Sequence, residues 1–284
     1  MIDYINYING KWLSESDSKI SIYDGGFLLG DGLFETIRFD NKNLFCIDKH
    51  LDRLNDGLDT IRIKLLQSNT EIKELLNNII KLNSIKSGLL RLMITRGYLE
   101  GPPWKFDGPA NIYITIRPFS KQPTDPVEVI FYSENDYPII RYNPAIKSLN
   151  YIGNMLAKKD ADIKGAYEPV FYNKDGYITE CAIRNIFFIK NNTLLTPNTT
   201  LGVLPGVMRS IIIDLAKKLN LNINETYIPY KDIDKMDEAF ISSTGIGLLP
   251  CLWQGWTSSF SVTNRLQNNL NKIIENNKIL HKKL

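Results

Sequence analysis

Three prolines within nine residues, Pro118, Pro123 and Pro126, interrupt the chain near its middle. Proline fixes its own φ angle and has no backbone N–H, so this stretch resists both helix interiors and central strands. We therefore predict an interdomain linker at residues 118–126, a small N-terminal domain at residues 1–117 and a larger C-terminal domain at residues 127–284. A length of 284 residues is sufficient for two domains with a sizeable core.

Strand and helix patterns occur on both sides of this linker. In the first part, a turn at Asn9-Gly10 separates two strand-like segments, and apolar residues at three-and-four spacing predict two helices, capped at Asp48 and Thr70. Strands are expected at YINYIN, KWLSE, LFETIRF, LFCI, LLRLMITR and NIYITIR. The Gly/Pro-rich segment at residues 97–109 is long enough to form a lid or a binding loop.

In the second part, strands are expected at VEVIFY, EPVFY, GYITE, NIFFI, TLLT and EAFISS. Helices are expected at NMLAKKDADIK, after GVLPG, and from about Val262 onward. The segment Asn173–Gly176 predicts a hairpin turn, and Trp253–Trp256 predicts a tight turn before the last helix. No internal repeat is visible, which excludes solenoid folds.

Composition narrows the class of protein. The net charge of +3, from 34 basic and 31 acidic residues, indicates neither nucleic acid nor an anionic membrane as a partner. Cys46, Cys181 and Cys251 are far apart and each lies in an apolar run, so we expect buried free thiols. Only His50 and His281 are available, which argues against a structural zinc site. With no signal pattern and no long apolar run, a cytoplasmic enzyme is expected.

Two segments could hold an anion, and two side chains could carry chemistry. Gly202–Arg209 opens a helix whose first N–H groups can bind an anion, and Ser242–Gly245 offers hydroxyl and backbone groups after a strand. Lys147 lies among apolar residues, where a lysine either serves as a Schiff-base nucleophile or extends its amine to solvent. Glu180 could pair with a buried cation or with Arg184. Taken singly, each feature is better explained by ordinary structure.

The order of these segments is more informative than any one of them. DGGFLLGDGLFETIRFD, HLDRL, IKSLNYIGNMLAKKDA, GYITECAIRNIFFI, LLTPN, LPGVMR and MDEAFISSTGIGLLP follow one another along the chain. Over roughly residues 4–250 the chain resembles the fold-type IV pyridoxal phosphate enzymes, the class IV aminotransferases. The resemblance implies an α+β or α/β fold of two domains, similar to D-amino-acid aminotransferase, with the cofactor in the cleft between them and the Schiff-base lysine in the C-terminal domain.

The same resemblance implies roles around a pyridoxal 5′-phosphate cofactor. Lys147 would form the Schiff base and later carry a proton, while Glu180 would pair with the pyridine nitrogen and keep it protonated. Arg53 would bind the phosphate. Further cofactor contacts are expected from Tyr151 at the phenolic oxygen, Leu204 on the ring face, and the Val207 and Met208 backbone and Thr244 at the phosphate.

Departures from the family's pattern bear on the substrate. Met208 stands where the family's transaminases commonly have threonine, and Thr36 stands where branched-chain members tend to have glycine. The FETIR and TRG segments are more similar to D-amino-acid transaminases and aminodeoxychorismate lyases. Arg96 or Arg38 could clamp a substrate carboxylate, although a surface arginine at a strand end is the alternative. The candidate substrate-binding residues are Arg96, Arg38, Phe27, Thr36 and Gly245.

Two reactions are compatible with these residues. We expect an aminotransferase that moves an amino group between an amino acid and a 2-oxo acid; the alternative is an aminodeoxychorismate lyase that releases pyruvate and forms 4-aminobenzoate. A non-enzymatic binding protein is disfavoured because Lys147, Glu180 and Arg53 are all present. The family also implies a homodimer in which loops of one subunit complete the other's pocket. Arg184 replaces a residue that is usually small in its motif, and the sequence offers no account of it.

Overall fold

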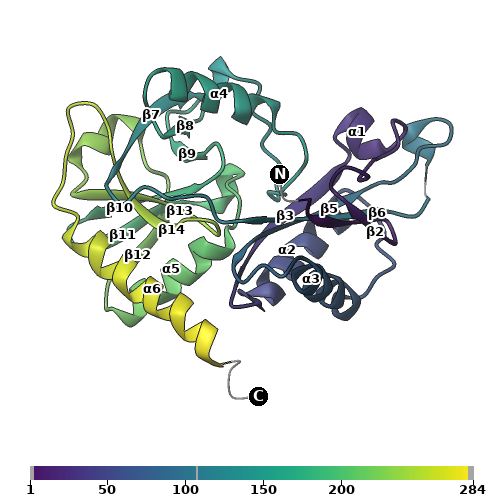
Figure 1. The fold of residues 1–284 in the computed structure, drawn as a ribbon. Coiled ribbons are helices and arrows are strands. Elements are labelled where there is room, and N and C mark those ends of the chain that lie inside the picture. The colour runs from purple at the N-terminus through teal and green to yellow at the C-terminus, as the bar shows by residue number, and fades with distance from the viewer. Residues whose placement is uncertain (1–2, 107, 281–284) are drawn as a thin grey trace. The chain divides into compact units, whose positions relative to one another are not determined.

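The computed structural model describes residues 3–106 and 108–280, and its strands form two separate sheets (Figure 1). The chain groups into two compact units. The first consists mainly of residues 1–120 together with Ile146–Asn150, and the second consists of Lys121–Ala145 and Tyr151–Asn276. The division between Ser120 and Lys121 lies inside the predicted linker. The placement of Ile146–Asn150 differs from the sequence-based division, which assigned Lys147 to the C-terminal domain.

The first unit contains a six-stranded antiparallel sheet in the order β2-β1-β6-β5-β3-β4. Its elements are β1 (Ile5–Ile8), β2 (Lys11–Ser14), α1 (Gly25–Leu29), β3 (Gly32–Asp40), β4 (Asn43–Leu44), α2 (Ile47–Thr60), α3 (Asn69–Asn83), β5 (Gly88–Thr95), the 3₁₀ turn Pro103–Lys105 and β6 (Asn111–Pro118). The apolar residues of α2 and α3 pack on one face of this sheet and bury Leu33, Ile37 and Phe39 of β3. Glu35 alternates with these residues on the same face, where Arg53 and His50 of α2 bond it, so Phe34, Thr36 and Arg38 lie on the opposite face.

The starts of the two helices differ from the sequence-based prediction. Asp48 was predicted as the cap of the first helix, but α2 begins at Ile47 and its cap position, Cys46, makes no side-chain capping bond. This early start also ends the predicted strand LFCI after Leu44. Thr70 is not the cap of α3 either, because the cap is Ser68, two residues earlier, which forms a capping box with Glu71. A serine with glutamate three positions later satisfies two backbone groups, whereas Thr70 offers no such pair.

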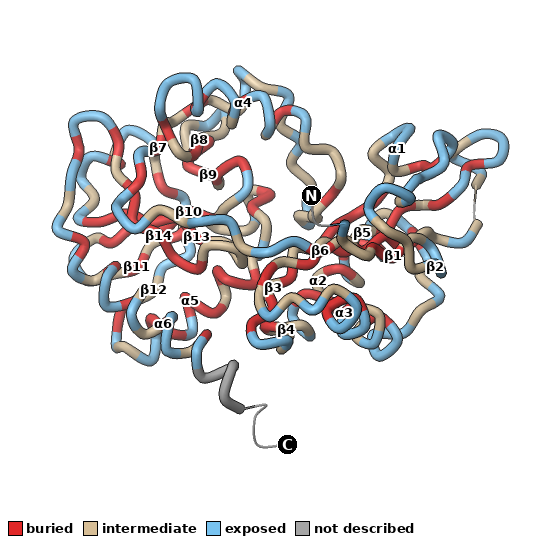
Figure 2. Tube along the Cα trace, in the orientation of Figure 1, coloured by how far each residue is buried: buried red, intermediate tan, exposed pale blue. Residues whose placement is uncertain are grey.

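The second unit contains an eight-stranded mixed sheet in the order β12-β11-β10-β13-β14-β7-β8-β9. Its elements are β7 (Val127–Ser133), the 3₁₀ turn Glu134–Asp136, α4 (Ile152–Ile163), β8 (Glu168–Tyr172), β9 (Ile178–Cys181), β10 (Asn185–Lys190), β11 (Thr193–Pro197), the 3₁₀ turn Thr199–Leu201, α5 (Val207–Lys218), β12 (Asn222–Thr226), the 3₁₀ turn Tyr230–Lys235, β13 (Glu238–Ser243), β14 (Gly247–Leu252) and α6 (Ser261–Leu280). Buried residues concentrate along its central strands (Figure 2).

Two of these strands, β12 and β14, were not predicted from the sequence. β14 lies between β13 and β7, and its Pro250 stands opposite Phe240. A proline inside a central strand is unusual, because it removes one ladder hydrogen bond, so the pattern argued against a strand there. The predicted turn at Trp253–Trp256 is confirmed by a bridge between these two residues, whose rings stack with centroids 3.9 Å apart.

None of the helices in the described part of the chain combines the length and apolar character needed to cross a membrane. Over the same residues, no group of three or more His, Cys, Asp or Glu side chains is arranged to hold a metal ion.

Candidate active site

Lys147 is held against β3 by backbone hydrogen bonds on both sides of it. The Phe34 N–H donates to the Lys147 carbonyl at 2.9 Å, and the Leu149 N–H donates to the Gly32 carbonyl at 3.0 Å. Lys147 Nζ lies 4.3 Å from the centroid of the Phe34 ring, and Phe34 is only 5% exposed. These contacts explain why Ile146–Asn150 groups with the first unit, and they keep the amine over a buried aromatic face.

A second cation, Arg91 of β5, lies over the same aromatic ring. Its guanidinium carbon is 3.9 Å from the Phe34 centroid. Arg91 stands opposite Thr36 in the β3–β5 ladder, so a hydroxyl and a guanidinium neighbour each other across these strands. Neither Arg91 nor Phe34 was predicted as a site residue from the sequence, because their neighbours in the structure lie on other segments of the chain.

Arg53 of α2 is bound to a buried carboxylate on β3. Its Nε and Nη2 donate to the two oxygens of Glu35 at 2.8 and 2.7 Å, and His50 Nδ1 lies 2.7 Å from the same carboxylate. Burial would raise the pKa of Glu35, but Arg53 and His50 outweigh it and lower the pKa to about 2. Glu35 therefore stays ionised and fixes the orientation of the Arg53 guanidinium.

The two arginines considered for a substrate carboxylate are both tied to aspartates. Arg96 Nε donates to Asp31 at 2.5 Å, and its Nη1 and Nη2 donate to the Arg62 and Ile61 carbonyls at 3.1 and 2.8 Å. Arg38 Nε donates to Asp40 at 2.5 Å. These contacts favour a structural role for Arg96 within the fold over a clamp for substrate. Of the other candidates in this unit, Phe27 is 62% exposed on α1 and Thr36 is half-buried on β3.

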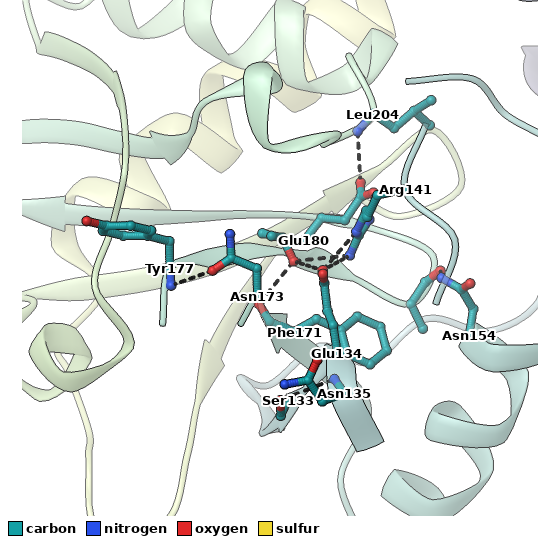
Figure 3. Close-up of polar contacts among 12 residues, drawn as sticks. Ser133, Glu134, Asn135, Arg141, Asn154, Phe171, Asn173, Tyr177, Glu180 and Leu204 are labelled. Carbon is teal, nitrogen blue, oxygen red and sulfur yellow. Dashed lines mark hydrogen bonds and ion pairs between the residues drawn. The ribbon is translucent and has the colours of Figure 1, made fainter. Parts of the chain in front are cut away.

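Glu180 of β9 is surrounded by donors within the second unit (Figure 3). Arg141 Nη1 donates to Glu180 Oε1, while the Leu204 N–H and Asn185 Nδ2 each donate to Oε2 at 3.3 Å. Arg141 also bonds Glu134, with Nη2 2.7 Å from Oε1. The sequence left open whether Glu180 pairs with a buried cation or with Arg184; the partner is Arg141, 39 residues away.

Arg184 instead belongs to a separate ion pair in the core. Its Nη1 donates to Glu168, which is fully buried, and its Nη2 donates to the Tyr167 hydroxyl at 2.9 Å. Burial raises the pKa of Glu168 even with Arg184 beside it. The arginine is thus explained by the carboxylate that it neutralises.

The start of α5 carries the features of an anion site. Gly206 occupies the cap position and no side chain caps the helix, so the first-turn N–H groups of Val207 and Met208 are not bonded by a cap. A Cβ at Gly206 would lie 2.0 Å from Asn185 Oδ1, so any other residue there would displace the Asn185 side chain. Asn185 Nδ2 also donates to the Leu204 carbonyl at 3.0 Å, which connects this helix start to Glu180.

Further hydroxyl groups lie at the end of β13. Ser242 stands opposite Asn185 in the β10–β13 ladder, is 1% exposed, and its Oγ has no hydrogen-bond partner in the described chain. Such a buried hydroxyl is costly unless a ligand or water meets it. Thr244 and Gly245 follow in the half-buried turn before β14, and Tyr151 occupies the N-cap position of α4 without a side-chain capping bond.

The predicted residues thus fall into two groups. The first unit holds Lys147, Arg53, Arg38, Arg96, Phe27 and Thr36; the second holds Tyr151, Glu180, Leu204, Val207, Met208, Thr244 and Gly245. The structure adds Glu35, His50, Phe34 and Arg91 to the first group and Arg141, Glu134, Asn185 and Ser242 to the second.

Comparison with known proteins points to one family. The family model for class IV amino-transferases matches residues 32–252. The chain is 32% identical over 265 residues to a putative branched-chain-amino-acid aminotransferase of Methanocaldococcus jannaschii, covering 93% of this chain and 89% of that protein. It is also 32% identical to a D-alanine aminotransferase of Listeria monocytogenes, with 86% and 85% covered, and to an aminodeoxychorismate lyase of Bacillus subtilis, with 86% and 84% covered.

The fold is similar to that of solved members. A branched-chain aminotransferase of Thermoproteus uzoniensis superposes with a TM-score of 0.87 over 96% of this chain and 95% of that one, at 21% identity. The sequence resemblance implied an α+β or α/β fold of this type; that prediction is confirmed, and the structure shows a two-sheet α+β architecture.

Proposed function

Because the chain belongs to the class IV aminotransferase family, whose enzymes depend on pyridoxal phosphate, we propose that it binds this cofactor and transfers an amino group between an amino acid and a 2-oxo acid. The observation that carries the proposal is the fixed carboxylate of Glu180, which receives three donors and lies next to an uncapped helix start. The donors bond both oxygens of the Glu180 carboxylate and so define its orientation.

The residues present fit the chemical groups of the cofactor. A phosphate dianion suits the uncapped N–H groups at the start of α5 and the buried Ser242 hydroxyl, and a guanidinium such as Arg53 supplies the opposite charge. A pyridinium N–H suits the ionised carboxylate of Glu180. An aldehyde suits the primary amine of Lys147, which rests on a buried ring. We propose that Tyr151, Leu204, Met208 and Thr244 complete the cofactor contacts.

Pyridoxal phosphate, when bound, supplies a ring that accepts electrons from the amino acid's Cα–H bond as it breaks. The chain's own residues supply the proton transfers. We propose that Lys147 Nζ takes the proton from Cα and returns a proton during transfer, while Glu180 holds the ring nitrogen's proton. Phe34 and the backbone bonds of Lys147 keep the amine in place between these steps.

The substrate carboxylate requires a cation near the amine. We propose Arg91 for this role, because its guanidinium carbon and Lys147 Nζ lie 3.9 and 4.3 Å from the centroid of the Phe34 ring. The relatives are named as aminotransferases for branched-chain amino acids and for D-alanine, so the test includes both L- and D-amino acids.

The second candidate reaction is aminodeoxychorismate cleavage. It is retained because the Bacillus subtilis lyase is 32% identical to this chain over 253 residues, the same identity as the two aminotransferases above. Both reactions need the same lysine and cofactor; they differ in whether a 2-oxo acid accepts the amino group.

The test starts from the purified holoenzyme. Borohydride reduction followed by peptide mapping should locate the cofactor on Lys147; an adduct on another lysine such as Lys158 of α4 would refute the assignment. The enzyme is then given L- and D-amino acids with 2-oxoglutarate or pyruvate, and separately aminodeoxychorismate. Amino transfer to the oxo acid supports the proposal, whereas pyruvate release from aminodeoxychorismate alone would replace it with the lyase.

We further propose that two copies of the chain assemble. Large apolar side chains are exposed on α1 and in the loop at residues 97–109, and others follow the outer face of α4. These residues are Phe27, Leu28, Leu29 and Trp104, and Ile152, Met155, Leu156 and Ile163. Exposed apolar surface of this extent is typical of an interface. Analytical ultracentrifugation of the holoenzyme should give a dimer; a monomer at micromolar concentration would refute this.

A further inference from the structure

Arg141 bridges two carboxylates, and only one of them, Glu180, has a proposed role. Nε and Nη2 of Arg141 both bond Glu134 Oε1, at 2.8 and 2.7 Å, and Nη1 bonds Glu180 Oε1 (Figure 3). The three side chains are largely buried, with exposed fractions of 17% for Arg141 and 14% for each glutamate. All three guanidinium nitrogens are therefore engaged between the acids.

The Thr179 hydroxyl bonds both Arg141 and Glu134 and so holds these two side chains together. Thr179 is fully buried beside Glu180 in β9, its Oγ1 donates to Glu134 Oε1 at 2.6 Å, and Arg141 Nη2 donates to the same Oγ1 at 3.1 Å. Glu134 enters from the 3₁₀ turn that follows β7. Burial would lower the pKa of Arg141, but Glu180 and Glu134 raise it, so the guanidinium stays charged.

The charge of this group explains why a second glutamate is useful. A single Arg141–Glu180 pair would be neutral, and its cation would oppose a further positive charge placed on the far side of Glu180. With Glu134 ionised, the group carries a net charge of −1. In a site of low effective dielectric, a net charge of −1 in place of 0 stabilises a proton on a neighbouring molecule strongly.

We propose that Glu134 and Arg141 are positioning residues that control the proton on the cofactor's ring nitrogen: Arg141 aims the Glu180 carboxylate, and Glu134 offsets the arginine's charge so that the nitrogen stays protonated. This inference rests on the proposed function, because it requires bound pyridoxal phosphate. It goes beyond that function because it assigns the stability of the ring nitrogen's proton partly to Glu134, a residue that has no proposed contact with the cofactor.

The test measures the ring nitrogen directly. The holoenzyme is reconstituted with cofactor labelled with ¹⁵N in the pyridine ring, and the ¹⁵N chemical shift is followed against pH in wild type and Glu134→Gln. The variant should lose the ring proton at a pH lower by on the order of one unit. Glu225→Gln is the matched control, since Glu225 accepts a hydrogen bond from Arg209 at 2.7 Å elsewhere in the same unit; its titration should match wild type.

A double variant separates charge from structure. Glu134→Gln/Arg141→Met restores a net charge of −1 through Glu180 alone, so its titration should return toward wild type although more contacts are lost. A merely structural role predicts the opposite, with the double variant further from wild type than the single one.

Each outcome decides the inference. Equal titration midpoints in wild type and Glu134→Gln would overturn it, even with cofactor bound normally. If Glu134→Gln does not fold, the double variant carries the test alone, and a midpoint far below wild type would overturn the inference. Failure of wild type to bind pyridoxal phosphate at all would instead refute the proposed function, and the inference with it.

Discussion

Replacing Glu35 with glutamine tests the buried cluster behind Arg53. The Glu35 carboxylate is 1% exposed and accepts hydrogen bonds from Arg53 at 2.8 and 2.7 Å. Its pKa is lowered from an ordinary 4.5 to about 2. At about 1.4 kcal/mol per pKa unit, this shift corresponds to roughly 3 kcal/mol of unfolding free energy. Because the folded-state pKa is the lower one, that contribution is present above pH 4.5 and is lost as the pH falls toward 2.

Glu35→Gln removes the negative charge and leaves the Arg53 guanidinium, whose side chain is 12% exposed, beside an amide. At neutral pH we expect the variant to lose about 3–5 kcal/mol of unfolding free energy, as when one partner of a buried ion pair is removed. Urea unfolding of the apoprotein between pH 2.5 and 7 measures this, with Glu225→Gln as a control carboxylate that is 44% exposed. The difference between wild type and variant should narrow as the pH falls below about 4.5. A difference that stays constant over this range would refute the assignment of the stabilisation to the ionised carboxylate.

Three further predictions concern single side chains. Asp24 is buried, and its Oδ2 accepts hydrogen bonds from Thr95, Asn111 and Tyr113 at 2.7–2.9 Å, so Asp24→Asn should cost about 2–4 kcal/mol of unfolding free energy in urea titrations; a cost below about 0.5 kcal/mol would contradict this. Arg96→Met should lower the thermal midpoint but leave KM for the amino acid nearly unchanged, and a tenfold rise in KM without loss of stability would instead support the substrate clamp. Glu180→Gln should retain the cofactor but slow proton removal by orders of magnitude in single-turnover kinetics, since each 1.4 kcal/mol of lost transition-state stabilisation costs about tenfold; a near wild-type rate would show that the charge is not needed.

The regular elements of the fold were predictable because their signals are local. Apolar residues at three-and-four spacing in α2 and α3, and alternation in β3 and β5, depend only on neighbours within a few positions. The linker prediction uses a local signal as well, since proline acts on its own backbone. Helix starts were less predictable, because several polar residues near Ser68 compete for one cap and only the paired Glu71 decides between them.

Elements that depend on distant partners were not predictable. β14 carries Pro250 and is accepted as a strand because β13 and β7 bond it on both sides. Arg184 has no explanation within its own motif, because its partner Glu168 lies on a neighbouring strand. In both cases the deciding contact lies outside any window in which a sequence pattern can be read.

The site shows the same division between residues that motifs reveal and residues that support them. Lys147 and Glu180 were identified because each lies in a motif of the family, but a motif says nothing of what holds its residues in place. Arg141 precedes Lys147 by six positions and is separated from Glu180 by 39, and it has no periodic or motif signal of its own. The sequence did contain an indirect signal for Arg141. A carboxylate at a partly buried strand end, such as Glu180, requires a cation elsewhere in the chain to neutralise it. Both Arg141 and Arg184 are candidates for the arginine that neutralises Glu180. Only the three-dimensional structure decides between them, because Arg184 is paired with Glu168 and Arg141 with Glu180.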